Sequence, residues 1–218
     1  MNAAPVAAAT GLRPLLPTLA AMAILLVVAL AAASRATAGF RAWTTEEVRR
    51  LRVAEQPVAL SELPVWASDG RERALWGGDP LARAWLVTFI YTRCPSACRS
   101  LGTEFQQLQA AMRSPDAAPG VRLASISFDR ARDSPEALAA YALRYGADRA
   151  AWLVAAPASE AGLERLLAEA GVVVIGDGMG GYAHNAAIHV VVPPGRLVRI
   201  FAMDQHREAL DFAARIAR

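Results

Sequence analysis

The run Trp-Leu-Val-Thr-Phe-Ile-Tyr at residues 85–91 is almost entirely apolar and is bounded by polar residues. Its richness in aromatic and β-branched residues favours a central strand that is buried on both faces. Over residues 97–112 apolar residues recur at helical spacing, so a helix is expected soon after this strand. A strand buried on both faces needs helices packed on each side of its sheet, which indicates an α/β fold.

Strands and helices continue to alternate along the rest of the chain. The predicted order is a strand over 121–128, a helix from Ser134 to Gly146, a strand over 152–155, a helix over 160–170, a hairpin over 187–201 with its turn at 193–195, and a helix over 206–217. This order predicts a thioredoxin-like central mixed sheet flanked by helices, with room for an extra hairpin before Trp85. About 175 residues remain once the first 40 are set aside, which suits one domain.

The amino-terminal part differs from this domain, because residues 15–33 carry no charge and are about long enough to span a bilayer of roughly 30 Å as a helix. A secretory signal is the alternative, since Ala-Thr-Ala at residues 36–38 resembles a cleavage site. The apolar run is longer than a usual signal core, which favours a retained anchor. We therefore expect a short tail over 1–14, the transmembrane or signal segment over 15–33, a linker over 34–54 and the domain over 55–218.

Either form of this segment delivers the domain across the membrane, and we expect it on the outer, periplasmic side of a bacterial inner membrane. The linker contains a pattern typical of a short helix capped at Thr44 or Thr45. All 23 basic residues are arginine, and the net charge of +3 is spread along the chain rather than clustered. Nucleic-acid binding is therefore not indicated.

The chain has two cysteines, Cys94 and Cys98, and both lie where the strand gives way to the helix. Residues four apart on a helix have Cβ atoms about 5 to 6 Å apart, close enough for two thiolates to bind one metal ion. A disulfide needs a shorter separation, which a slightly unwound first turn allows. The helix amino terminus and Arg93 both favour ionised thiols. The spacing of the two cysteines is therefore compatible with both metal binding and disulfide chemistry.

Two thiolates rarely complete a metal site, so the three histidines are the next candidates. His184 lies in a glycine-rich segment before the predicted hairpin, His189 lies within its first strand, and His206 opens the last helix. A loop histidine is more often solvated than bound to metal, and a strand histidine is more often packed in the sheet. Spacing alone does not select a third ligand.

Three stretches resemble the motif blocks of the Sco/SenC family: Phe-Ile-Tyr-Thr-Arg-Cys-Pro-Ser-Ala-Cys, the segment 125–142, and the segment 181–201. The family consists of membrane-anchored thioredoxin-fold proteins that help to assemble the CuA centre of cytochrome c oxidase. The resemblance implies that Cys94, Cys98 and His184 bind one copper ion. Gly195, in the family's hairpin turn eleven residues after His184, supports this alignment.

Some positions depart from the family pattern. Ala183 and Asn185 flank His184 where an acidic residue and serine are usual, so a carboxylate that orients the ring is missing from that position. His189 stands where an aromatic residue is common and is a possible additional nitrogen ligand. Asp129 and Asp133 match acidic positions of the second block; Asp129 is a secondary candidate near the site, and Asp133 is expected to belong to a helix cap.

These features lead to a copper-binding metallochaperone as the expected function. Its implied partners are the copper-bearing subunit of cytochrome c oxidase or another copper chaperone. The alternative is an enzyme, a thiol–disulfide oxidoreductase that reduces the target's cysteines through Cys94 and Cys98. A thiol peroxidase is a third and weaker hypothesis.

Overall fold

A computed structural model describes residues 15–94, 97–113 and 119–218. The chain divides into two compact units, Met1–Val48 and Arg49–Arg218. The first unit contains helix α1, Leu15–Ala36. Within the described residues, one helix, Pro17–Ala36, is long and apolar enough to cross a membrane, and it lies near the amino terminus.

Helix α2, Thr45–Glu55, begins with a reciprocal cap. The backbone N–H of Glu47 donates to Oγ1 of Thr44, and the N–H of Thr44 donates to the Glu47 carboxylate, both at 3.1 Å. This is the capping box expected for a Thr-x-x-Glu sequence. The short helix predicted here is confirmed, and its cap is Thr44.

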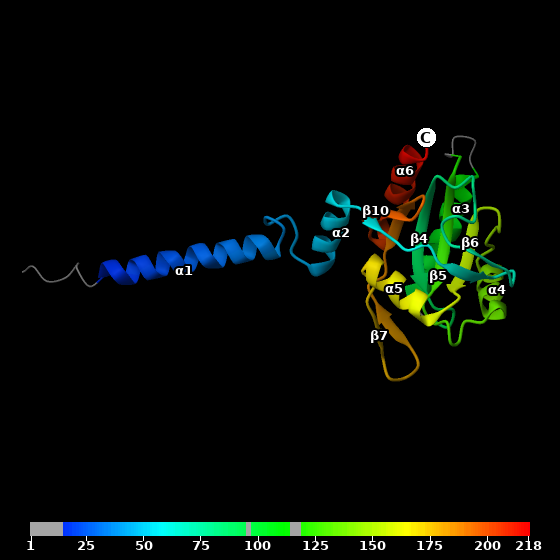
Figure 1. Ribbon diagram of the computed structural model, residues 1–218, viewed down its shortest axis with the longest axis horizontal. Helices are drawn as coiled ribbons and strands as arrows, with labels where there is room; N and C mark the ends of the chain where they lie inside the picture. The colour runs from blue at the N-terminus through cyan, green and yellow to red at the C-terminus, as the bar shows by residue number, and fades with distance from the viewer. Residues whose placement is uncertain (1–14, 95–96, 114–118) are drawn as a thin grey trace, which may run out of the picture. The chain divides into compact units, whose positions relative to one another are not determined.

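The second unit is built on an eight-stranded mixed sheet with helices on its faces, as predicted (Figure 1). The strand order is β1-β10-β9-β4-β5-β6-β2-β3, in which β4, β5 and β6 are parallel and β9 runs antiparallel to β4. The strands are β1 Val58–Ala59, β2 Pro64–Ala67, β3 Glu72–Ala74, β4 Ala84–Ile90, β5 Val121–Ser127, β6 Trp152–Pro157, β9 Ile188–Val192 and β10 Arg196–Phe201.

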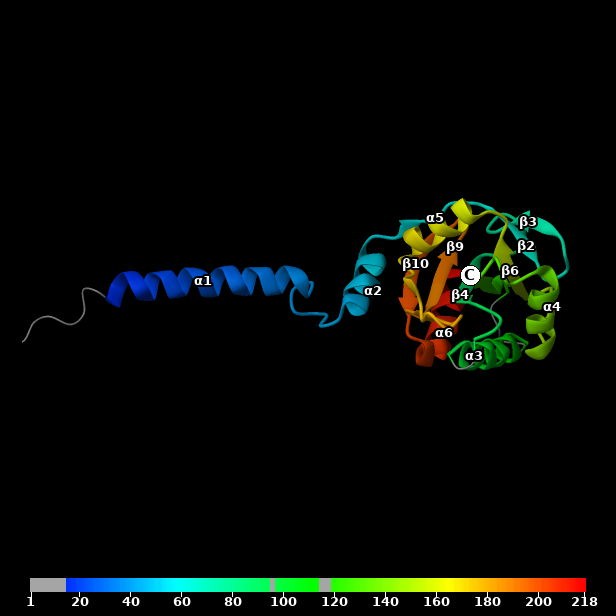
Figure 2. The ribbon, with the colours of Figure 1, turned by 90° about the horizontal axis from the view of Figure 1, so that it is seen from below.

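Helices cover both sides of this sheet. They are α3 Ala97–Met112, α4 Pro135–Arg144, α5 Glu160–Ala170 and α6 His206–Ile216, with a short 3-10 turn at Met203–Gln205. Figure 2 shows α5 on one side of the sheet and α3 and α6 on the opposite side. Every residue of β4 is buried, which confirms a central strand covered on both faces.

Local signals account for the helix boundaries. Oγ of Ser134 accepts a hydrogen bond from the N–H of Ala137 at 3.4 Å, and Pro135 occupies the first turn of α4. Helix α5 ends at Gly171, whose φ of 64° lies in the left-handed region that glycine adopts without strain. The pair β2 and β3 is the extra hairpin before Trp85, and it extends the sheet beyond β6.

A second, two-stranded sheet was not predicted. Strands β7, Val174–Gly176, and β8, Tyr182–His184, form an antiparallel hairpin in the segment that the sequence suggested was a glycine-rich loop. Figure 1 shows this hairpin projecting from the sheet. Its turn is closed by Asp177, whose Oδ1 accepts hydrogen bonds from the N–H groups of Met179 at 2.7 Å and Gly181 at 2.8 Å. Side-chain closure of this kind lets a glycine-rich segment form a turn.

Candidate metal centre

The topology brings the Cys94 and His184 segments to one edge of the main sheet. Cys94 follows the carboxyl end of β4, and His184 precedes the amino end of β9. Val87 pairs with His189 in the antiparallel register of these two neighbouring strands. The end of one antiparallel strand meets the start of its neighbour, so the Cys94 and His184 segments leave the sheet at the same edge.

Asp133 braces the loop that carries Cys94. Its carboxylate accepts hydrogen bonds from the N–H of Thr92 at 2.9 Å, from Oγ1 of Thr92 at 2.6 Å and from Oγ of Ser127 at 2.5 Å. Asp133 is buried, and hydrogen bonds to a buried carboxylate are among the stronger ones in proteins. The prediction that Asp133 belongs to a helix cap is wrong, because Ser134 caps α4 and Asp133 holds the cysteine loop.

Cys94 is itself buried, with 9% of its surface exposed. Its backbone N–H donates to the carbonyl of Tyr91 at 3.3 Å, which closes a turn directly after β4. Cys98 is the second residue of α3. The side chain of Cys98 lies outside the part of the chain that the structure describes. Among the described residues, no three histidine, cysteine, aspartate or glutamate side chains form a metal-binding group.

His184 ends β8 and is half-buried. Both ring nitrogens are buried, and neither has a hydrogen-bond partner among the described residues. The ring packs edge-to-face on Phe128, with centroids 5.0 Å apart. Burial lowers the pKa of His184 below its ordinary value of 6.5, because desolvation disfavours the charged imidazolium. At neutral pH the His184 ring is therefore an uncharged imidazole, and its unprotonated nitrogen has a lone pair available for a metal ion. This is the form of histidine that binds metals.

The lowered pKa has a measurable consequence. In NMR titration of the histidine ring protons, His184 is expected to titrate with a midpoint below 6.5. Since the unfolded chain then binds the proton more tightly than the folded chain, His184 favours the unfolded state as pH falls below about 6.5. A midpoint at or above 6.5 would contradict the desolvated environment. His184→Asn identifies the signal, because the assigned resonance disappears.

Asn185 occupies the position after His184 and does not orient the ring. Its Oδ1 accepts from the N–H of Val173 at 2.7 Å, and its Nδ2 donates to the carbonyl of Gly171 at 3.0 Å. Asn185 therefore ties the end of β8 to the end of α5. His184 is held by its backbone position and by ring packing.

Asp129, a secondary candidate from the sequence, belongs to a cluster that supports the β7–β8 hairpin. It is buried and pairs with Arg132, with Oδ2 2.6 Å from Nε. Arg132 also donates from Nη1 to the carbonyl of Gly180 at 2.6 Å, and its guanidinium lies 5.1 Å from the ring centroid of Tyr182. Tyr182 packs in turn on Phe128, the residue that contacts His184. Asp129 thus acts through Arg132 on the position of the hairpin.

Arg132 was not singled out from the sequence, although its spacing of three residues from Asp129 is a usable signal. Arg132→Gln is expected to speed amide hydrogen exchange in β8 by about fivefold to tenfold, since one or two charge-assisted bonds that hold the hairpin are lost. Arg130→Gln is the matched control, because Arg130 donates instead to the carbonyls of Pro157 and Ala158. Equal exchange in both variants would argue against this role of Arg132.

His189, the other secondary candidate, lies inside the sheet. It is buried in β9, and its ring packs perpendicular to Phe89 with centroids 5.3 Å apart. Its Nε2 lies 3.4 Å from Nη1 of Arg49, whose positive charge disfavours a metal ion on that nitrogen. The structure therefore packs His189 against Phe89 and Arg49 inside the domain and not in the loop that carries Cys94.

His206 opens α6, as predicted, and its ring nitrogens also have no hydrogen-bond partner among the described residues. The nearby charged group is Glu104, whose pKa is raised by burial, an effect that His206 opposes. An imidazole without partners is thus not sufficient to mark the centre. What distinguishes His184 is its place beside β9, at the edge where Cys94 follows β4.

The sequence model of the SCO1/SenC family matches residues 68–218, which is more than half of the chain. The chain belongs to the SCO1/SenC family. This SCO1/SenC match includes β4, the cysteine loop, the β7–β8 hairpin and the strands that follow it. No curated protein matches the sequence.

Solved structures share the SCO1/SenC fold of this chain. A SCO1/SenC family lipoprotein from Bacillus anthracis aligns with a TM-score of 0.66 and 18% identity over 75% of this chain and 98% of its own. BsSco, described as a Sco family member with a disulfide switch, aligns with a TM-score of 0.62 and 18% identity over 74% of this chain and 95% of its own. Bradyrhizobium japonicum ScoI with copper bound aligns with a TM-score of 0.58 and 21% identity over 73% of this chain and 99% of its own. At these identities the likeness establishes the thioredoxin-like Sco fold.

Proposed function

We propose that this protein is a metallochaperone that carries one copper ion on Cys94, Cys98 and His184. The observation that carries the proposal is the His184 ring. Its two buried nitrogens have no hydrogen-bond partner among the described residues, and it lies at the sheet edge where Cys94 follows β4. Two thiolates and one imidazole suit copper(I), and the same donors accept copper(II) when a further ligand is added.

Family membership supports the choice of copper and of its destination. ScoI of Bradyrhizobium japonicum was solved with copper bound, and BsSco is described as a member of a family of cytochrome c oxidase assembly proteins. We infer that the cargo goes to the CuA site of cytochrome c oxidase. The partner is then the copper-bearing oxidase subunit, with another copper chaperone as the possible source of the ion.

A site with three protein ligands explains how the copper ion passes to an acceptor protein without entering solution. Three ligands leave a coordination position open, so a cysteine or histidine of the acceptor enters before the donor residues leave. Cys94 and Cys98 must be thiolates for this exchange. The amino terminus of α3 and the adjacent Arg93 both favour that form.

The proposed location follows from α1. We infer that α1 anchors the chain in the bacterial inner membrane and that residues 55–218 act on the periplasmic side. The length and apolar composition of Pro17–Ala36 support an anchor. An anchored donor stays in the plane of the membrane in which its oxidase acceptor resides.

The function is tested by transfer. The full chain in detergent is loaded with copper(I) and mixed with the copper-free soluble CuA domain of an oxidase subunit, and the visible absorption of the CuA centre is followed after oxidation. We expect the absorption to appear with the loaded protein and to be absent when Cys94→Ser replaces it. If a chain that binds one copper ion transfers none of it, the delivery role is wrong.

A further inference from the structure

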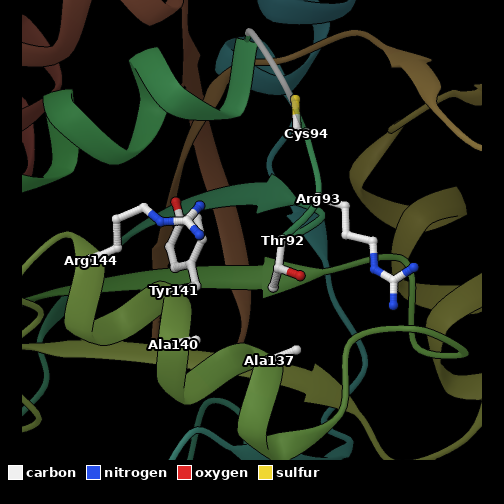
Figure 3. Close-up of a pocket in the computed structure, with 7 residues that line it drawn as sticks. All are labelled: Thr92, Arg93, Cys94, Ala137, Ala140, Tyr141 and Arg144. Carbon is white, nitrogen blue, oxygen red and sulfur yellow. The ribbon is translucent and has the colours of Figure 1, made fainter.

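A groove lies directly beside Cys94. The cysteine loop forms one side of it with Arg93 and Cys94, and helix α4 forms the other side with Ala137, Ala140 and Arg144 (Figure 3). Its volume is about 540 Å³. This volume lies within the range of roughly 300 to 1,000 Å³ that is usual for small-ligand sites.

The shape of the groove comes from the sequence of α4. Residues 137, 140 and 144 share one face of the helix, because they are spaced three and four apart. Alanine at two of these positions leaves the space above the helix open. Seven residues of helix rise about 10 Å, which matches the length of about three extended residues of a peptide.

The charge of the groove is positive. Arg93 and Arg144 are both exposed, and Figure 3 shows them on opposite sides of Cys94. Neither forms an ion pair or a side-chain hydrogen bond with a described residue, and no described lining residue is a carboxylate. A ligand with two separated carboxylates would pair with both guanidinium groups.

We propose that this groove binds a short anionic peptide thiol, about three residues long, and presents its sulfur to Cys94. The carboxylates of the peptide lie against Arg93 and Arg144, and its cysteine lies between them. The inference rests on the proposed function in one respect, which is that Cys94 is a reactive thiolate of the copper site. It adds the class of thiol with which that residue exchanges.

The exchange is a balanced thiol–disulfide step. The Cys94 thiolate attacks one sulfur of the oxidised peptide, whose sulfur–sulfur bond breaks as a bond between Cys94 and that peptide forms. The second peptide leaves as a thiolate, so Cys94 is oxidised and the released peptide is reduced. The reverse step, with the reduced peptide as nucleophile, returns Cys94 to the thiolate that copper binding needs.

The test uses the full chain in detergent with Cys98→Ser, so that Cys94 is the remaining thiol. Oxidised glutathione is the anionic probe and cystamine the cationic one. The rate of mixed-disulfide formation with each probe is measured by mass spectrometry. Arg144→Gln is expected to lower the ratio of the two rates by about fivefold, the effect of one exposed ion pair. The matched control is Arg149→Gln, which removes an exposed arginine outside the groove and should leave the ratio unchanged.

An unchanged ratio in Arg144→Gln, or an equal fall in Arg149→Gln, would overturn the proposal. Copper stoichiometry measured on the chains that keep both cysteines separates this outcome from failure of the proposed function. Arg144→Gln is expected to bind one copper ion as the parent does. If the parent binds no copper but still shows the Arg144-dependent ratio, the copper function is wrong and the peptide-thiol groove stands.

Discussion

Replacing His184 with alanine is expected to weaken copper(I) binding by more than about a hundredfold. Loss of residues that merely orient a metal ligand already costs about tenfold to a hundredfold in affinity, and removal of a ligand costs at least as much. Affinity is measured by competition with a chromogenic copper(I) chelator on the full chain in detergent. Cys94→Ala is expected to give a loss of similar or larger size, because the remaining thiolate and imidazole leave a two-coordinate site.

His206→Ala is the matched control for this measurement. His206 also has ring nitrogens without a hydrogen-bond partner among the described residues, but it opens α6 and lies beside Glu104. It should therefore keep the parent's affinity. If His206→Ala lost copper and His184→Ala did not, the third ligand would be assigned to the wrong histidine.

Asp133→Ala is expected to lower the free energy of unfolding by about 3 kcal/mol. The change removes three hydrogen bonds to a buried carboxylate, and it leaves the Thr92 N–H and the Ser127 hydroxyl without their acceptor. Chemical denaturation followed by tryptophan fluorescence measures the effect. Because Thr92 stands two residues before Cys94, the loosened loop is also expected to weaken copper binding.

Asp211→Ala provides the control for charge, since it removes an exposed carboxylate from α6. Surface substitutions of this kind usually change stability by less than about 0.5 kcal/mol. A similar loss of unfolding free energy in Asp133→Ala and Asp211→Ala would show that Asp133 does not brace the loop. Asp133→Asn separates shape from charge, because the amide can still accept from Thr92 but more weakly than a carboxylate does.

The elements that sequence patterns predicted well are those with local signals. Strand β4 is apolar except for Thr88, α4 begins at Pro135 with Ser134 as its cap, and α5 covers Glu160–Ala170 as predicted, ending at Gly171. In each case the residues that set the boundary lie within one or two turns of it. Periodicity and capping are therefore sufficient to locate these elements.

Periodicity and capping signals do not predict contacts between segments that are far apart in the sequence. Asp133 lies 41 residues from Thr92, and a Ser-Pro cap directly after it gave a simpler local explanation. His189 meets Arg49 across 140 residues, so the sequence left it as a possible ligand. The β7–β8 hairpin is held by Arg132, which donates to the carbonyl of Gly180 across 48 residues. Tertiary packing decides all three.

The central claim is that Cys94, Cys98 and His184 together hold one copper ion. X-ray absorption spectroscopy of the copper(I)-loaded full chain tests it most directly, because sulfur and imidazole neighbours of the ion scatter differently. The expected result is two sulfur ligands and one imidazole nitrogen at one copper per chain, with loss of the imidazole signal in His184→Ala. A spectrum with two sulfurs and the same imidazole signal in His184→Ala, or with no sulfur at all, would contradict it.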